Sequence, residues 1–313
     1  MYMKINIVIG AIVVLAVAIG GYLLFKGSSD TVVVNPQENT PEEQMPVEPN
    51  NGIGDGAEPL DAILAEGPET VIGASVDGND IVAYHYGTGD TELLFVGGTH
   101  AGYSGNTVLV AYELMDYLEE NPSLIPNNVK VTVIPVLNPD GLEKVYGTTE
   151  RFDVKDAPTD HSVTTAGRFN ANNVDLNRNF DCEWAASGTW QSKTVSGGSK
   201  PFSEPESSAV RDYVYTHDIA GAVVWYSAAG GVFSSSCQNG VSTETKALTN
   251  IYASAAGYKA YEEFNFYEIT GDMVNWFAKE NIPAISVLMT DHENTEWTKN
   301  KKGIDAVLNH YAE

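Results

Sequence analysis

Hydrophobic and polar residues follow two patterns along most of the chain. Short, uninterrupted apolar runs are typical of buried strands, and apolar residues recurring every three or four positions are typical of amphipathic helices. Strands alternating with helices predict an α/β fold, a mixed and mostly parallel central sheet with helices on both faces. The turn at residues 87–90 also predicts that the first two strands pair as a hairpin. The expected strands are residues 80–86, 93–96, 129–137, 220–226 and 282–289, and the expected helices are residues 108–120, 204–217, 243–256, 271–281 and 298–311.

The N-terminal part of the chain has a different pattern. Residues 5–25 are apolar without a single charge, which is enough to span a hydrocarbon core of ~30 Å. We therefore expect residues 1–26 to form a transmembrane helix that anchors the chain. A cleaved signal peptide is the alternative, because residues 16–18, Ala-Val-Ala, resemble a cleavage site. Residues 27–58 are rich in proline and acidic residues and predict a disordered linker, so one folded domain is expected at residues 59–313.

Charge and cysteine content restrict the environment of the domain. Lys4 lies on the short side of the apolar segment and an acidic linker follows it, so the positive-inside rule favours a single-pass protein of the cell membrane with an extracytoplasmic domain. The net charge of -25 excludes nucleic acid as a partner, and we attribute it to solubility. Cys182 and Cys237 fit one disulfide of an exported domain or two buried thiols.

The segment FVGGTHAGYSGN, residues 95–106, indicates where chemistry could occur. A strand ends in two glycines, and His100 follows before the next helix begins. Open α/β sheets bind ligands beyond the carboxyl ends of their strands, so His100 is a candidate site residue. A histidine in this place can equally cap the helix or satisfy a buried hydrogen bond.

Three further motifs carry a family resemblance. They are NPDG at residues 138–141, GRFNANNVDLNRNF at residues 167–180, and YEITGDMVNW at residues 267–276, which precedes the apolar run IPAISVLM. In this order and spacing the chain resembles the zinc carboxypeptidases, the M14 metallopeptidases, over roughly residues 80–310. The resemblance implies a zinc hydrolase that removes residues from peptide C-termini.

The chain departs from this family at the metal site. Family members bind zinc through a His-x-x-Glu pair and a later histidine, and leave a fourth position for water. The matching positions here hold His100, Tyr103 and Tyr226, and the position of the family's general base holds Leu288. Structural zinc sites contribute ~10–16 kcal/mol, so the loss of two ligands should reduce affinity by many orders of magnitude. We expect zinc to be absent or weakly bound, and hydrolysis to be impaired.

The residues that bind substrate in the family are present. By resemblance, Arg168 polarises the scissile carbonyl, Asn177 and Arg178 hold the terminal carboxylate, and Tyr267 covers the pocket. The planar fork of arginine pairs with both carboxylate oxygens, which suits it to reading a C-terminus. The same residues also have a structural explanation, because Asn and Arg in buried loops often bind backbone carbonyls.

Two expectations concern the altered metal site. Tyr103 and Tyr226 should fill the volume of the metal and its ligands, with their hydroxyls bonded to His100 or Arg168. Alternatively, His292 and Glu293, in the segment TDHENTEW, approach the cleft and rebuild a metal site.

The sequence thus predicts a membrane-tethered, carboxypeptidase-like pseudopeptidase that binds peptide C-termini or cell-wall peptides. One alternative is an active zinc metallocarboxypeptidase with a rearranged metal site. Another is a structural domain of a surface assembly, in which the old pocket is closed. The sequence does not identify the preferred terminal side chain.

Overall fold

The computed structural model describes residues 67–156, 158 and 160–312. The predicted anchor and linker, residues 1–58, lie outside this part of the chain. Within the described residues, no helix combines the length and apolarity needed to cross a membrane. Contacts divide the chain into residues 1–57 and 58–313, and the described residues all belong to the second unit.

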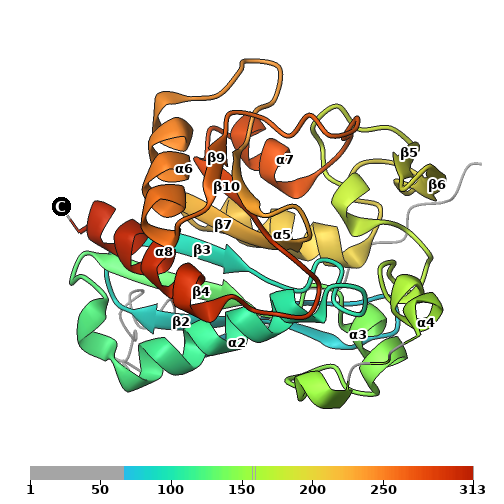
Figure 1. The fold of residues 1–313 in the computed structure, drawn as a ribbon, viewed down its shortest axis with the longest axis horizontal. Coiled ribbons are helices and arrows are strands. Elements are labelled where there is room, and N and C mark those ends of the chain that lie inside the picture. Colours follow the sequence, from blue (N-terminus) through green and yellow to red (C-terminus); the bar gives the residue numbers. More distant parts are fainter. Residues whose placement is uncertain (1–66, 157, 159, 313) are drawn as a thin grey trace, which may run out of the picture. The chain divides into compact units, whose positions relative to one another are not determined.

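An eight-stranded mixed sheet forms the centre of this unit, in the order β1-β2-β4-β3-β7-β10-β8-β9 (Figure 1). The four central strands β4, β3, β7 and β10 run parallel to one another. Next to them, β2 and β8 run antiparallel; at the two edges, β1 pairs antiparallel with β2 and β9 pairs parallel with β8. The mixed α/β sheet with a parallel centre is therefore confirmed. The strands are β1 (Glu69–Ala74), β2 (Asp80–Gly87), β3 (Thr91–Val96), β4 (Val129–Ile134), β7 (Ile219–Ser227), β8 (Gly231–Ser234), β9 (Lys259–Tyr261) and β10 (Ala284–Met289).

Helices cover both faces of the sheet, as the continuous apolar strands predict. Along β3 and β7, alternate side chains enter two different cores: Phe95 and Trp225 pack on one face, and Leu94 and Val224 on the other. The first face is covered by α2 (Gly105–Glu120), α6 (Thr243–Ala256) and α8 (Trp297–His310), and the second by α5 (Pro205–Thr216) and α7 (Met273–Lys279).

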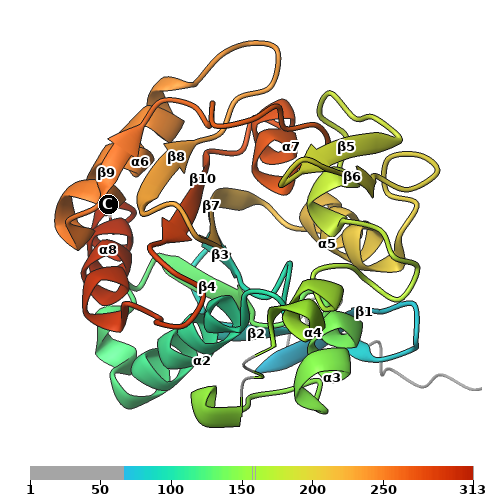
Figure 2. The ribbon, with the colours of Figure 1, turned by 45° about the vertical axis from the view of Figure 1, so that its right-hand side comes forward.

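Shorter elements lie outside the central sheet. Figure 2 shows the β5–β6 hairpin on the side of α7 and α5. This hairpin contributes to the candidate site described below. The shorter elements are α3 (Pro139–Tyr146), α4 (His161–Ala166), β5 (Ser187–Trp190), β6 (Lys193–Ser196) and the 3-10 turns Pro122–Leu124, Val154–Asp156 and Leu176–Arg178.

The predicted hairpin between residues 80–86 and 93–96, which form β2 and β3, is wrong. Strand β4 lies between β2 and β3, so that β3 pairs with β4 and β7 instead. The connecting turn crosses the start of β4, where the Thr91 amide donates to the Asn128 carbonyl at 2.9 Å. Gly89 permits the crossing, because a Cβ there would lie 1.9 Å from the Asn128 carbonyl carbon. Placed between two parallel neighbours, β3 is almost completely buried, as its apolar sequence requires.

A disulfide joins Cys182 to Cys237 across 55 residues. It ties the segment that follows the 3-10 turn Leu176–Arg178 to the loop after β8. Both cysteines of the chain are used in this bond.

Candidate functional site

The loop after β3 places His100 in the interior. Gly98 has a φ of 64°, and a Cβ there would lie 2.9 Å from the Pro135 carbonyl oxygen. The amide of Asn138 donates to the Gly98 carbonyl at 2.9 Å, so the loop packs directly on the segment that follows β4. The two glycines thus allow the close approach that buries His100, as predicted for a site beyond the carboxyl end of this strand.

The NPDG motif connects this loop to the segment that carries Arg168. The Asn138 side chain caps α3 by accepting from the Gly141 amide at 2.9 Å. Its amide group also lies 3.4 Å from the Arg168 carbonyl, a long contact. Gly102, Gly141 and Gly167 meet so closely that a Cβ on Gly102 would lie 2.0 Å from the Gly141 carbonyl oxygen. Three distant segments therefore converge where only glycine fits.

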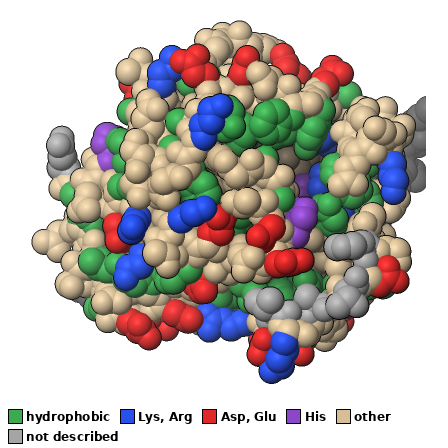
Figure 3. Space-filling model, in the orientation of Figure 1, with side chains coloured by type: hydrophobic (Ala, Val, Ile, Leu, Met, Phe, Trp, Pro, Cys, Tyr) green, Lys and Arg blue, Asp and Glu red, His purple; other side chains and the backbone are tan. Residues whose placement is uncertain are grey.

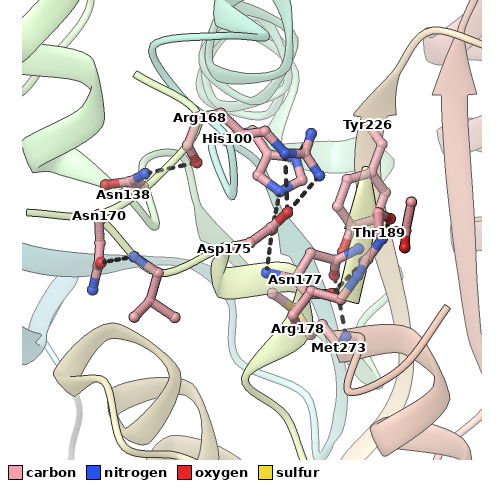
Figure 4. A network of polar contacts seen from close by, with 11 residues as sticks. His100, Asn138, Arg168, Asn170, Asp175, Asn177, Arg178, Thr189, Tyr226 and Met273 are labelled. Atoms are coloured by element: carbon pink, nitrogen blue, oxygen red, sulfur yellow. Dashed lines mark hydrogen bonds and ion pairs between the residues drawn. The ribbon is translucent and has the colours of Figure 1, made fainter. Parts of the chain in front are cut away.

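His100, Asp175 and Arg168 form a closed network at this point (Figure 4). The Asp175 carboxylate accepts from His100 Nε2 at 2.8 Å through Oδ1. Its Oδ2 accepts from Arg168 Nε at 3.0 Å and Nη2 at 2.9 Å. The Nη1 of Arg168 lies 3.3 Å from His100 Nδ1, so both ring nitrogens have a partner. All three side chains are almost completely buried.

Burial and charge determine the protonation of this network. Burial and the adjacent Arg168 guanidinium outweigh Asp175 and lower the pKa of His100 to about 4. Burial acts to raise the pKa of Asp175, but Arg168 and His100 together hold it well below its usual range. At neutral pH the network is thus an ion pair of Asp175 and Arg168 with a neutral imidazole. The imidazole donates from Nε2 and accepts from Arg168 at Nδ1.

Tyr103 and Tyr226, which the resemblance aligns with zinc ligands, pack near this network: the Arg168 guanidinium carbon lies 5.9 Å from the centre of the Tyr103 ring. The Tyr226 hydroxyl donates to Asn177 Oδ1 at 2.8 Å, and its ring centroid lies 6.1 Å from that of His100. Burial raises the pKa of Tyr226 well above its usual value, so its hydroxyl stays protonated. The Tyr103 hydroxyl accepts from Gln191 at 3.1 Å. The expected bonds from these hydroxyls to His100 or Arg168 are therefore wrong, because each hydroxyl bonds to an amide side chain instead.

The donor atoms at this position do not fit zinc. A metal ion would need a free nitrogen of His100, but one nitrogen binds Asp175 and the other faces the Arg168 cation. His292 comes near Tyr103, with ring centroids 4.5 Å apart, and its Nδ1 contacts Ser104 Oγ at 3.1 Å. Glu293 is exposed. Within the residues that the structure describes, no three His, Cys, Asp or Glu side chains are arranged to hold a metal.

A cleft of about 430 Å³ opens beside the network. His100, Arg168, Asn177 and Tyr226 line one part of it, and its wall includes Leu288, the residue that the resemblance aligns with the family's base. Tyr267 also lines the cleft and is 43% exposed.

Arg178 lies behind this lining and is 1% exposed. Its Nη1 donates to the neighbouring Asn177 carbonyl at 2.7 Å, its Nη2 lies 3.4 Å from the Thr189 carbonyl, and its Nε has no partner. The guanidinium carbon is 5.9 Å from the centre of the Tyr267 ring. A buried cation with an unused donor favours an anionic group nearby.

Sequence reasoning missed three residues of this site. Asp175 lies within the quoted DLNRNF motif, but only the fold shows that its carboxylate reaches His100, 75 positions away. Trp190, at the end of β5, lies 4.4 Å from the Arg168 guanidinium and lines the cleft. Asp272 caps α7 and also lines the cleft. An aspartate before a helix signals the cap, but nothing in the sequence signals its position in the cleft.

Comparisons with known proteins agree with this architecture. A family model described as zinc carboxypeptidase matches residues 60–312. Among curated proteins, carboxypeptidase Z of Mus musculus is 31% identical over 122 residues, 35% of this chain and 17% of its own length. Carboxypeptidase O of Bos taurus is 35% identical over 107 residues, 33% of this chain and 26% of its own length. The matched segments thus cover only about a fifth of the length of these relatives.

Solved structures share the fold at low sequence identity. Murein-tripeptide amidase MpaA from Escherichia coli O157 has a TM-score of 0.55 at 19% identity, covering 82% of this chain and 97% of its own. Bovine thrombin-activatable fibrinolysis inhibitor, solved in complex with a tick carboxypeptidase inhibitor, has a TM-score of 0.60 at 15% identity. The match covers 77% of this chain and 89% of that structure.

Proposed function

The chain belongs to the zinc carboxypeptidase family, and on this basis we propose that it binds peptide C-termini without hydrolysing them efficiently. The ligands would be free peptides or cell-wall peptides, held in the cleft beside His100. We further propose that residues 5–25 tether the domain to the cell membrane on its extracytoplasmic side. The disulfide between Cys182 and Cys237 supports export, because such bonds persist in oxidising compartments.

The observation that carries the proposal is the closed network of His100, Asp175 and Arg168. In the family, zinc supplies Lewis-acid polarisation of the scissile carbonyl and activates the attacking water. Here both nitrogens of the one matching ligand are engaged, and the Arg168 cation faces the nitrogen that a metal would need. Repulsion between this guanidinium and a divalent ion opposes metal binding.

The position of the general base supports the same conclusion. Leu288 has no group that could take a proton from water, and general base catalysis alone typically contributes ~10²–10⁴ in rate. Because both the metal and the base act on the attacking water, their loss affects the same step. The cleft is therefore better suited to binding than to hydrolysis.

The cleft still offers groups for a peptide end. Asn177 lines it, and the Arg178 guanidinium lies immediately behind, with its Nε donor unused. Tyr267 lies over this cation at the mouth. A terminal carboxylate would gain charge-assisted hydrogen bonds there, which are roughly twice as strong as neutral ones.

The test compares a fluorescent tripeptide with a free C-terminus and its C-terminal amide, by anisotropy against the full-length chain. We expect the free acid to bind at least about tenfold more tightly, with no change on adding EDTA, and Arg178→Ala to abolish the difference. Arg178→Lys keeps the charge but not the planar guanidinium, so its preference for the free acid should lie between that of the unchanged chain and that of Arg178→Ala. Arg151→Ala, which removes an exposed arginine outside this cleft, is the matched control.

Other outcomes would favour the alternatives. Release of the terminal residue that stops with EDTA would show an active metallocarboxypeptidase, and ligands near His292 would then be sought. Equal and negligible binding of both peptides would favour a structural role in a surface assembly. Digestion of the domain by protease added to intact cells tests the proposed location, and complete protection would contradict it.

A further inference from the structure

The β5–β6 hairpin, residues 187–196, has a fixed base and a lightly held tip. At the base, the Asp175 amide donates to the Ser196 carbonyl at 2.9 Å. The Gly197 amide donates to the Ala186 carbonyl, also at 2.9 Å, and closes the base of the hairpin. The base is therefore attached to the segment that carries the carboxylate of the central network.

The hairpin has little core of its own. Within residues 187–196, Trp190 and Val195 are the only buried side chains. Its two turn residues, Gln191 and Ser192, have φ values of 48° and 63°, a conformation for which two-residue hairpin loops prefer Asn and Gly. A two-stranded hairpin is at best marginally stable by itself in water. The position of this hairpin thus depends on the contacts that its tip makes.

The tip rests on Tyr103, one of the residues that the resemblance aligns with zinc ligands. The Gln191 side chain donates to the Tyr103 hydroxyl at 3.1 Å, in an exposed hydrogen bond. The rings of Tyr103 and Trp190 meet nearly edge to face, with centroids 5.1 Å apart. Tyr103 in turn contacts the ring of His292, before α8. Exposed hydrogen bonds and single aromatic pairs each contribute little, so the tip can separate from Tyr103.

The tip covers Arg168. The Trp190 ring lies 4.4 Å from the Arg168 guanidinium carbon, and Arg168 is 4% exposed. Trp190 also lines the cleft. In Figure 3 a histidine side chain is visible between the centre of the face and its right-hand part, where Figure 1 places the hairpin. The hairpin thus borders the cleft and shields the arginine that the resemblance assigns to the peptide carbonyl.

We propose that the β5–β6 hairpin is a lid over the Arg168 side of the cleft and that Tyr103 is its latch. The proposal concerns the regulation of this site, and it rests on the proposed binding of peptide C-termini. A peptide reaches Arg168 only after the tip has left Tyr103 and Trp190 has moved off the guanidinium. The closed state lowers the apparent affinity, because only the open fraction of the molecules binds.

Fluorine NMR of the full-length chain labelled with fluorotryptophan follows the lid without a ligand. The chain has five tryptophans, and the resonance of Trp190 is the one that disappears in Trp190→Phe. We expect Tyr103→Ala to move this resonance toward the position of an exposed tryptophan, because the latch is gone. Adding the free-acid tripeptide to the unchanged chain should move it in the same direction. Tyr215→Ala removes an exposed tyrosine of α5 and is the matched control, which should leave the Trp190 resonance in place.

Stopped-flow anisotropy with the fluorescent free-acid tripeptide measures access to the cleft. Tyr103→Ala should speed association by about five- to tenfold, since the open fraction rises. Tyr103→Phe keeps the ring but loses the hydroxyl, so association should be about two- to threefold faster. Gln191→Ala should match Tyr103→Phe, and the double variant should be no faster than either, because both changes remove one hydrogen bond.

Each result has a definite meaning. A Trp190 resonance that stays in place in folded Tyr103→Ala and Gln191→Ala variants would overturn the lid, and peptide binding in the same samples would leave the proposed function standing. A shifted resonance with an unchanged association rate would show that the hairpin does not control access. Effects of Tyr103→Phe and Gln191→Ala that add in full would rule out their hydrogen bond as the latch. A shifted resonance without peptide binding in any variant would instead overturn the proposed function.

Discussion

Replacing Asp175 by asparagine tests the central network most directly. The side chain changes little in size, but the charge that balances Arg168 disappears in a site with almost no solvent. The amide nitrogen of asparagine must take the place of one carboxylate oxygen. At Oδ2 it would face two donors of Arg168, and at Oδ1 it would face His100 Nε2. The other imidazole tautomer relieves that second conflict only by pointing Nδ1–H at Arg168.

The size of the effect follows from these contacts. Asp175 accepts from Arg168 twice and from His100 once, all within 3.0 Å, and its Oδ1 also accepts from the Asn177 amide at 3.2 Å. Removing one partner of a buried ion pair typically costs ~3–5 kcal/mol, because the other charge stays buried without compensation. We expect a loss of this size in the free energy of unfolding.

Urea denaturation of the full chain, followed by tryptophan fluorescence and far-UV circular dichroism, measures this loss. With a slope of roughly 3 kcal/mol per molar urea for a domain of this size, the midpoint should fall by about 1 to 1.7 M. Asp116→Asn breaks an exposed pair with Arg151 and is the matched control, with an expected loss below about 1 kcal/mol. A loss below about 1 kcal/mol for Asp175→Asn would refute the view that this network holds the site together.

Three further predictions concern metal, pH and the disulfide. After incubation with zinc and gel filtration, elemental analysis should find about 0.1 zinc per chain or less, and the His100→Ala variant should give the same value. One zinc per chain that is lost in this variant would contradict the proposal that the site does not bind zinc. Burial raises the pKa of Asp272 from 3.8 to about 6 although Arg178 opposes the shift, so its ionised form destabilises the fold. Asp272→Asn should therefore stabilise the protein by up to about 3 kcal/mol at pH 8, with the gain shrinking below about pH 6 and vanishing below about pH 4 in urea titrations. A pH-independent gain would show that this carboxyl does not titrate as described. Replacing Cys182 and Cys237 by serine opens a loop of 55 residues and should cost about 4 kcal/mol, a fall of roughly 10 °C in Tm by calorimetry; an unchanged Tm would mean that the loop is held by other contacts.

The apolar pattern predicted the central elements because their hydrophobicity is a local property. The runs around Phe95 and Trp225 are apolar on both faces, which only a sheet covered on both sides can bury. The order of strands in the sheet depends on pairing between segments that are distant in the sequence, so the local pattern does not predict it. The hairpin prediction failed because β4 inserts between β2 and β3, and Gly87 and Gly89, which pack against the start of β4, do not by themselves reveal this. Short edge strands such as β9, with three residues, carry too little pattern to be seen.

In the candidate site, too, the sequence predicts which residues take part but not how they contact one another. The motifs identified His100, Arg168 and Asn177, and the fold brings all three to one cleft. The hydrogen bonds of these side chains could not be predicted, because they join residues far apart in the sequence: Asp175 and His100 are 75 positions apart, and Tyr226 and Asn177 are 49 positions apart. Arg178, which the resemblance assigns to the terminal carboxylate, lies behind the lining of the cleft, where its Nη1 and Nη2 contact backbone carbonyls and its Nε has no partner.

The network gives the DLNRNF motif a structural role that needs no metal. A metal-binding histidine usually donates its other nitrogen to a carboxylate, so that the imidazole lies between a negative group and a cation. His100 has this arrangement, with Asp175 on one side, but the cation on the other side is the guanidinium of Arg168. The buried carboxylate is therefore balanced by the chain itself. In this structure the motif supports one wall of the cleft through Asp175 and Asn177.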